Sequence, residues 1–247
     1  METNRIIMQT LSYGEERIRY QVCHVLDREG KVAIHVHPDG SVQVDAPMDA
    51  ELTAIKSAVQ KRARWVMGHI VKARELREYV LPREYVSGES HYYQGRRYQL
   101  KVLSTEEAVG SVKLHRGQIM MKANDVSPAR VRKMLRDWYR ARAKDYFSRR
   151  LKDITARVSW LAEVPEWQLL TMKKQWGSCS PKGILSLNPY LVKAPRECIE
   201  YVLLHESCHL QEHNHSPRFY RLLTEQMPEW KSVKAKLDGM SELLLNE

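Results

Sequence analysis

Hydrophobic and polar residues follow a β pattern in the first part of this chain and helical patterns in its last part. From Gln9 to about Leu103, β-rich stretches alternate with turn signals, which predicts hairpins. The turns are expected at Gly14-Glu15 and Pro38-Asp39-Gly40, with two further hairpins at Gln94-Gly95-Arg96 and His115-Arg116-Gly117. One long helix interrupts these strands; Asp49 is placed to cap it, and the pattern runs over residues 51–78.

Further along, the pattern predicts a second long helix and a short hairpin. A Ser-Pro pair begins the helix, which spans residues 127–158. Alternating residues at 167–171 and a short apolar stretch at 184–187 read as strands, with a Ser-Pro-Lys-Gly turn between them. We expect these two strands to pair as a hairpin that leads into the next helix. Trp176 is expected to pack that hairpin against the helix.

The next helical pattern carries the chemistry. Pro195 suits the first turn of a helix, where its missing N–H has no partner to lose. Apolar residues then recur at spacings of three and four, with no Gly or Pro before Asn214: Cys198, Ile199, Val202, Leu203 and Leu210. His205 and His209 continue this stripe, so both side chains are predicted to face inward.

Two histidines at this spacing indicate a metal site. An α-helix advances about 100° per residue, so His205 and His209 lie on one face and can bind the same ion. Glu206 lies beside them, within reach of a water on that ion. Zinc lowers the pKa of its water and a carboxylate takes the proton, so the string predicts metal-assisted hydrolysis. By composition alone, such a string arises in a chain of this length with a probability on the order of 1%.

Catalytic zinc usually takes three protein ligands, and His215 is the favoured third one. Its separation from His209 is that of metzincins, where the chain leaves the helix at a glycine. Glu212 occupies the glycine position here, and Asn214, which tolerates the left-handed conformation, is expected to end the helix. Ser216-Pro217 then begins another helix. The alternatives to His215, which would then be an ordinary loop residue, are His213, Glu225 and Glu229.

Several short motifs around this helix resemble one family. They are Lys-x-x-Trp-Gly-Ser-Cys-Ser at 173–180, Leu-Asn at 187–188, Ala-Pro at 194–195, His-Glu-x-x-His at 205–209 and Asn-His-Ser-Pro-x-Phe at 214–219. Together they resemble the YgjP-like metallopeptidase family, with SprT-like proteases as more distant relatives. The resemblance implies a zincin-like catalytic domain in which His205, His209 and His215 bind zinc and Glu206 is the catalytic base.

Three positions depart from the family pattern. Gln175 stands where the family often has Arg, Ser207 replaces an aliphatic residue, and Tyr220 replaces Trp. None of them belongs to the metal set. Because Gln lacks the guanidinium fork, Gln175 weakens the case for one particular anionic substrate. The substrate-binding residues stay unknown at this stage.

Length and composition favour an α+β enzyme. The 247 residues, 43% of them apolar, can supply one large core or two modest ones. We expect a β-hairpin-rich region with long helices over residues 1–126, followed by a zincin-like catalytic region with the metal-binding helix over residues 127–247. The two regions could pack as one unit.

The remaining composition favours a cytoplasmic protein that does not enter membranes. No apolar run reaches the roughly 18 to 20 residues that cross a bilayer, and the start lacks a secretory signal. Four cysteines without a Cys-x-x-Cys pair suit reduced thiols: Cys23, Cys179, Cys198 and Cys208. Cys179 as a nucleophile or metal ligand is an alternative that the complete His-based set disfavours.

The chain is basic, with a formal net charge of +10. The helix at 127–157 holds eleven basic and three acidic residues, and residues 56–77 form a second basic helix. Such surfaces attract polyanions, so contact with nucleic acid is one hypothesis. The alternative is a solvated face whose long cationic side chains cover apolar neighbours.

Three functions follow from these observations. The first is a zinc-dependent metallopeptidase acting on a peptide that an edge strand holds. The second, which the family resemblance implies, is a nucleoside triphosphate pyrophosphatase acting on UTP at the same zinc. The third is a zinc-binding module without turnover, with or without DNA; Glu206 argues against it, because structural zinc sites usually close the fourth position with a protein ligand.

Overall fold

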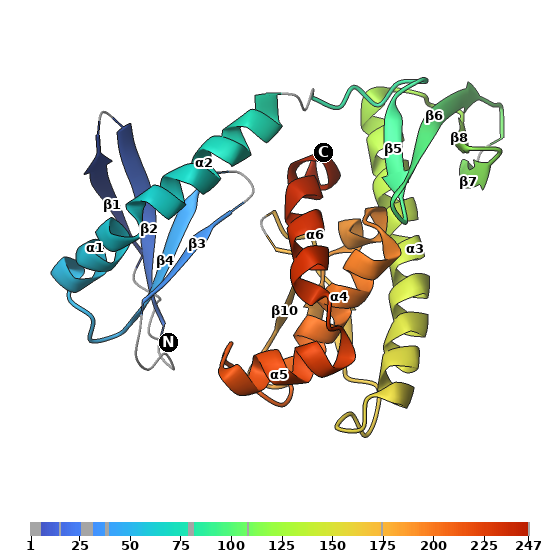
Figure 1. Cartoon of the computed structure of the whole chain (residues 1–247). Helices are drawn as coiled ribbons and strands as arrows, with labels where there is room; N and C mark the ends of the chain where they lie inside the picture. Colours follow the sequence, from blue (N-terminus) through green and yellow to red (C-terminus); the bar gives the residue numbers. More distant parts are fainter. Residues whose placement is uncertain are drawn as a thin grey trace. The chain divides into compact units, whose positions relative to one another are not determined.

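The computed structural model describes residues 6–14, 16–25, 32–37, 40–78, 82–107, 109–173 and 175–246. The chain forms two compact units, Met1–Leu81 and Pro82–Glu247, shown in Figure 1. The described residues form a mixed α+β structure with three small sheets and six α-helices, which confirms the predicted class. Among them, no helix is long and apolar enough to cross a membrane.

The first unit pairs one sheet with two helices. Its strands, in the order β1-β2-β4-β3, are β1 (Ile6–Tyr13), β2 (Glu16–Val25), β3 (Ala33–Val36) and β4 (Val42–Pro47). β2 and β4 run parallel, and the other two pairs are antiparallel. The helices bury their apolar stripe, which includes Ile55, Val59 and Val66, against the sheet. The expected turn residues Glu15, Pro38 and Asp39 lie outside the described residues.

The helix predicted over residues 51–78 is two helices, α1 (Leu52–Lys61) and α2 (Ala63–Glu78). The chain breaks at Arg62, whose backbone (φ −110°, ψ 10°) leaves the helical range and whose N–H donates to the carbonyls of Gln60 and Val59. The prediction that Asp49 caps the helix is also wrong. Glu51 occupies the N-cap, with no hydrogen bond from its side chain. A continuous hydrophobic period cannot reveal such a break, because both helices bury the same stripe.

The second unit begins with a sheet in the order β5-β6-β8-β7. Its strands are β5 (Ser90–Tyr93), β6 (Arg96–Ser104), β7 (Ser111–His115) and β8 (Gln118–Ala123). Both predicted hairpins are confirmed, each with a two-residue loop. Gln94-Gly95 and Arg116-Gly117 all have positive φ, as a type I′ turn requires and as its twist relative to the strands favours.

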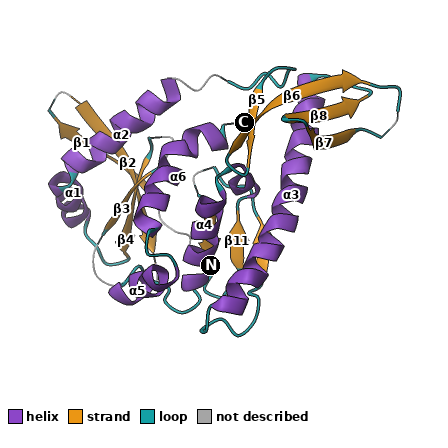
Figure 2. Cartoon of the chain, turned by 45° about the vertical axis from the view of Figure 1, so that its right-hand side comes forward, coloured by secondary structure: helices purple, strands orange, loops and turns teal. Residues whose placement is uncertain are grey.

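The remainder of the second unit surrounds one central helix. Its elements are α3 (Pro128–Arg157), β9 (Trp167–Leu169), β10 (Gly177–Cys179), β11 (Leu185–Leu187), the 3-10 helix η1 (Pro189–Lys193), α4 (Arg196–Cys208), α5 (Pro217–Gln226) and α6 (Trp230–Leu245). α4 contacts α3, α5, α6 and β10, and Figure 2 shows α4 with α3, α5 and α6 around it. α3 begins directly after Ser127, as predicted.

The predicted hairpin before the central helix pairs different strands. β11 pairs antiparallel with β10 and parallel with β9. The 180–183 turn therefore joins β10 to β11. The prediction that this turn joins the segment at 167–171 to the strand at 184–187 is wrong, because β9 pairs with β11 in parallel. The sheet order β10-β11-β9 leaves β10 at an edge. Trp176, just before β10, is half-buried and packs against the core, in line with the prediction.

The boundary between the two units lies elsewhere than the expected cut after residue 126. One hydrophobic core extends from Tyr85 and Leu100, through Leu135 of α3, to Leu204 and Leu244. The sheet β5–β8 therefore shares its core with α3 and α4. Position 126 lies inside the second unit, between β8 and α3. Turn signals and charge identified the junction between two elements, but they could not indicate a shared core.

Candidate metal centre

Three histidines from the end of α4 and the segment after it converge on one point. One ligating nitrogen from each of His205, His209 and His215 lies within 4.8 Å of the other two. The ring centroids are 4.8 to 5.1 Å apart. Among the described residues, this is the cluster that could hold a metal ion, and the alternatives His213, Glu225 and Glu229 are not part of it. The three histidines expected from the sequence are brought together.

The local geometry of the helix end orients His209. α4 ends at Cys208, earlier than the predicted end near Asn214, and His209 is its C-cap. The N–H groups of Gln211 and Glu212 both donate to the carbonyl of Cys208 at 3.0 Å, which tightens the final turn. His209 Nδ1 lies 3.2 Å from the carbonyl of Glu212. A proton on Nδ1 in that hydrogen bond leaves Nε2 free as the ligating atom.

His215 is held by the start of the next helix. Ser216 is the N-cap of α5, and its Oγ accepts from the N–H groups of Arg218 and Phe219 at 3.2 and 3.3 Å, as predicted. The prediction that Asn214 ends the helix in the left-handed conformation is wrong. The described non-glycine residues with positive φ are Tyr85, Gln94 and Arg116, and Asn214 is not among them. The Asn214 carbonyl instead accepts from the Ser216 N–H at 2.7 Å.

The aromatic ring of Phe219 packs against all three imidazoles. Its ring centroid lies 4.9 Å from His205, 4.6 Å from His209 and 4.7 Å from His215. The side chain is fully buried, so it cannot move away from the cluster without opening the core. Phe219 thereby fixes the three rings relative to one another. The Ser-Pro-x-Phe motif places Phe219 one turn after His215, and this spacing was the only indication in the sequence. Spacing alone did not predict that Phe219 contacts the histidines.

The protonation state of the cluster suits a cation. Burial, and then the neighbouring His215 and His209, lower the pKa of His205 to about 3. Burial also lowers the pKa of His209. The Nε2 atoms of His205 and His215 face each other at 3.1 Å. Neutral imidazole nitrogens around a common point are the donor set of a borderline divalent transition-metal ion, and the residues therefore fit such an ion.

Glu206 lies on the same helix, next to the first histidine of the cluster. It is 7% exposed, and burial raises the pKa of its carboxyl to about 8. Among the described residues, none forms a hydrogen bond with this carboxylate. The carboxylate is thus available for a water or substrate.

The edge strand β10 passes directly over Glu206. A Cβ atom at Gly177 would lie 2.7 Å from Cγ and 2.8 Å from Oε1 of Glu206. A side chain at this position would have to displace the side chain of Glu206, so the glycine lets the strand and the Glu206 carboxyl lie this close. Cys179, at the other end of β10, has its thiol pKa raised to about 11 by burial and by Glu206. The thiol is therefore protonated at neutral pH and does not suit a nucleophile.

Comparison with known families matches this site to one of them. Residues 30–240 match the model of the YgjP-like metallopeptidase domain. The chain belongs to the YgjP-like family. This confirms the resemblance inferred from the motifs, and the chain is a metallopeptidase-family domain with a three-histidine site that could hold a metal.

Solved structures of two archaeal proteins are similar to part of this YgjP-like chain. The metallopeptidase zymogen jannalysin of Methanocaldococcus jannaschii is 27% identical, with a TM-score of 0.31, over 35% of this chain and 92% of that one. The zymogen abylysin of Pyrococcus abyssi is 24% identical, with a TM-score of 0.33, over 41% of this chain and 94% of that one. No curated protein sequence matches the chain.

Asn188 organises the loop that leads into β10 of the YgjP-like domain. Its side chain is fully buried, and Nδ2 donates to the carbonyls of Met172 at 2.7 Å and Gln175 at 3.0 Å. Its backbone N–H donates to the carbonyl of Trp176 at 2.9 Å, and Oδ1 caps η1. The Leu-Asn motif was visible in the sequence, but its partners were not.

The three departures from the family pattern leave the histidine cluster intact. Gln175 is exposed and contributes its carbonyl to Asn188. Ser207 is buried, and its Oγ donates to the carbonyl of Leu203 at 2.8 Å, one turn earlier in α4. Tyr220 stacks on both His215 and Trp230, with centroid distances of 6.1 and 5.3 Å.

Proposed function

We propose that the chain is a zinc-dependent metallopeptidase. His205, His209 and His215 hold the ion, and Glu206 is the general base. The observation that carries the proposal is the three-nitrogen cluster together with the buried carboxyl of Glu206, the residue next to His205, which lies against the edge strand β10. Three protein ligands leave a tetrahedral ion one open position, the arrangement of catalytic rather than structural zinc.

The chain's own residues supply the rest of the reaction. Bound zinc would polarise the scissile carbonyl and acidify a water. Glu206 takes the proton of that water on its carboxylate and then delivers it to the nitrogen of the leaving amine. Burial raises the pKa of this carboxyl to about 8, so without an ion it is mostly protonated at neutral pH. The positive charge of a bound ion would lower that pKa and leave the carboxylate that accepts the proton. β10 orients an extended peptide by main-chain hydrogen bonds along its free edge.

The test pairs metal analysis with hydrolysis. Wild-type protein loaded with zinc is expected to bind about one ion per chain and to cleave an unfolded protein substrate. Glu206→Gln keeps the shape of the side chain and the three ligands, so it should retain zinc and lose cleavage. Equal cleavage by the variant would remove Glu206 from the mechanism.

The same preparations separate peptide hydrolysis from the two other functions. Release of pyrophosphate from UTP, abolished in Glu206→Gln and unaccompanied by peptide cleavage, would replace the peptidase with the nucleotide hydrolase. Zinc binding without either activity, with no change on mutation of Glu206, would support a binding module.

A further inference from the structure

The helices of the first unit carry a basic face that the metal centre does not use. Between residues 52 and 74 the chain has six basic residues and no Asp or Glu: Lys56, Lys61, Arg62, Arg64, Lys72 and Arg74. Most apolar residues of the same helices are buried against the sheet, whereas Leu52, Trp65 and Val71 are exposed. Folding requires only that the opposite face be polar. Charge of a single sign over this stretch, which ends at Glu75 of α2, therefore calls for another explanation.

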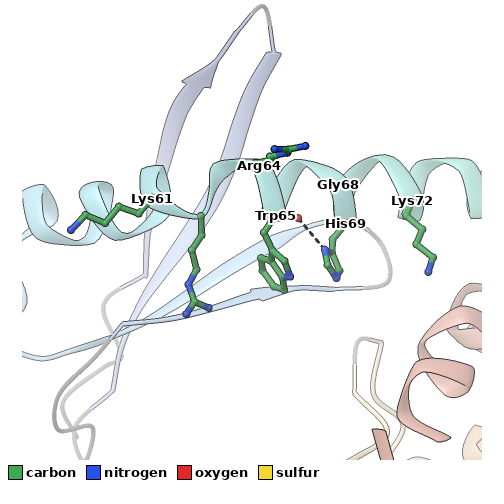
Figure 3. A pocket seen from close by; sticks show the side chains of 7 residues that line it. Lys61, Arg64, Trp65, Gly68, His69 and Lys72 are labelled. Carbon is green, nitrogen blue, oxygen red and sulfur yellow. Dashed lines mark hydrogen bonds between the residues drawn. The ribbon is translucent and has the colours of Figure 1, made fainter. Parts of the chain in front are cut away.

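An open cavity of about 710 Å³ lies on this face, drawn in Figure 3. Its lining includes four cations around two aromatic rings: Lys61, Arg62, Arg64 and Lys72 around Trp65 and His69. Among the described residues, none of these four cations forms an ion pair, whereas Arg74 lies 3.9 Å from Glu16. The charges lining the cavity are therefore uncompensated and available to a ligand.

Trp65 offers a flat surface in the middle of the cations. The side chain is 44% exposed. Trp65, His69 and Lys72 point to the same side of the helix, Lys61 extends along it, and Arg64 points to the opposite side (Figure 3). His69 Nδ1 lies 2.9 Å from the Trp65 carbonyl, and its ring packs 4.3 Å from the indole. Gly68 adds no side chain, and a Cβ there would have no neighbour within 4 Å. The surface beside the indole thus stays open.

We propose that this face binds a single-stranded polynucleotide, with phosphates on the cations and a base stacked on Trp65. Within α2 alone, Arg64 and Lys72 are separated by about 12 Å along the helix, at 1.5 Å of rise per residue, and Lys61 and Arg62 precede them. A small anion would need donors that converge, whereas a row of separated charges matches a linear polyanion. An accessible ring among those charges is the second element of single-strand binding, because every base has a face that can stack.

The test measures the anisotropy of a labelled oligothymidylate with the full chain across a salt series. Affinity is expected to fall steeply as salt rises, because binding releases counterions. Lys61→Gln/Lys72→Gln should weaken binding about tenfold at low salt. The matched control is Arg136→Gln/Lys144→Gln, which removes the same charge from exposed positions of α3 and should leave the affinity unchanged.

Substitutions at Trp65 separate stacking from simple hydrophobic contact. Trp65→Phe should retain most of the affinity, and Trp65→Leu should lose about tenfold. Because Trp65 lies outside the core, thermal unfolding of both variants should match wild type, which excludes misfolding as the cause. The same variants mixed with anionic vesicles test a membrane as the occupant, since Leu retains the ability to insert.

Three results would overturn the proposal. The first is an absence of salt-sensitive binding by wild type. The second is a loss that follows the α3 control rather than the Lys61/Lys72 pair, which would place the site on α3. The third is vesicle binding by wild type and Trp65→Leu without binding of the oligonucleotide. None of these outcomes depends on the metal centre.

Discussion

Gly177 lies so close to Glu206 that any larger residue at position 177 would have to displace the Glu206 side chain. A Cβ at Gly177 would lie 2.7 Å from Cγ of Glu206, closer than carbon atoms approach without displacement. Because Gly177 begins the edge strand β10, this contact sets how close that strand lies to the carboxyl proposed as the general base.

Replacement of Gly177 should separate β10 from the side chain of Glu206. We expect Gly177→Ala to displace Glu206, reduce peptide cleavage at least tenfold, and lower the free energy of unfolding by about 1–3 kcal/mol. Zinc content should not change, because no ligand is touched. The matched control is Gly239→Ala on the open face of α6, expected to stabilise by about 0.5–1 kcal/mol. Full activity in Gly177→Ala would show that the contact is unimportant.

The two histidines of the segment after α4 should differ in metal binding. His215 belongs to the cluster and His213 does not. His215→Ala should weaken zinc binding at least about 100-fold. This loss exceeds the range typical of mutating residues that only orient the ligands. His213→Ala should bind zinc like wild type. Competition with a chromogenic chelator measures both, and the opposite ranking would reassign the third ligand.

Tyr220 should act on the metal through His215. It stacks between His215 and Trp230, with interplanar angles of 26° and 14°. Tyr220→Ala removes this brace, and we expect zinc affinity to fall by about 10-fold or more, as for other residues that orient ligands. Tyr220→Trp, which keeps a stacking ring, should restore it. The readout is zinc affinity from chelator competition, so an unchanged value in Tyr220→Ala would contradict the brace even if activity changed.

Asn188 should matter for stability more than its size suggests. Asn188→Asp keeps the shape but loses both donated hydrogen bonds, leaving two carbonyls unpaired next to a buried carboxylate. Both hydrogen bonds are partly buried and Asn188 itself is fully buried, so the substitution should lower the free energy of unfolding by about 1–3 kcal/mol. Ser186→Ala, on the neighbouring strand, is the control for a lost surface hydrogen bond. Equal effects of the two substitutions would argue against the role of Asn188.

Acid should destabilise the second unit through His91. Burial, and then the charges of Arg83 and Lys193, lower the pKa of His91 to about 3. The carboxylate of Glu89 lies 3.5 Å from Nε2, but it is also paired with Arg83 at 3.2 Å. The unfolded state, in which histidine has a pKa near 6.5, binds the proton more readily. Stability from this group is therefore present above pH 6.5 and is lost as the pH falls towards 3.

Denaturant unfolding at several pH values measures this dependence. The slope from His91 is at most about 1.4 kcal/mol per pH unit. His91→Gln is expected to have a lower free energy of unfolding than wild type at pH 7. The difference between the two should become smaller as the pH falls, because only wild type loses stability through His91. A difference that is constant with pH would mean that His91 is not held neutral in the folded state.

The sequence by itself indicated the histidine set of the candidate metal centre and the local elements around it. His205, Glu206 and His209 were predicted because helical spacing alone places them together, and Ser216-Pro217 because capping is local. The two-residue hairpin loops at Gly95 and Gly117 were predictable for the same reason. These features depend on interactions within a few residues, which an amino-acid pattern records directly.

The tertiary structure decided what depends on partners distant in sequence. It paired β10, not the segment at 167–171, with β11, and it joined the sheet β5–β8 to the core of α3. It also placed Phe219 beneath three imidazoles and Gly177 against Glu206. In the sequence, Phe219 cannot be told apart from any other core residue, or Gly177 from any other turn glycine. Only packing, in which two atoms cannot occupy one volume, distinguishes them.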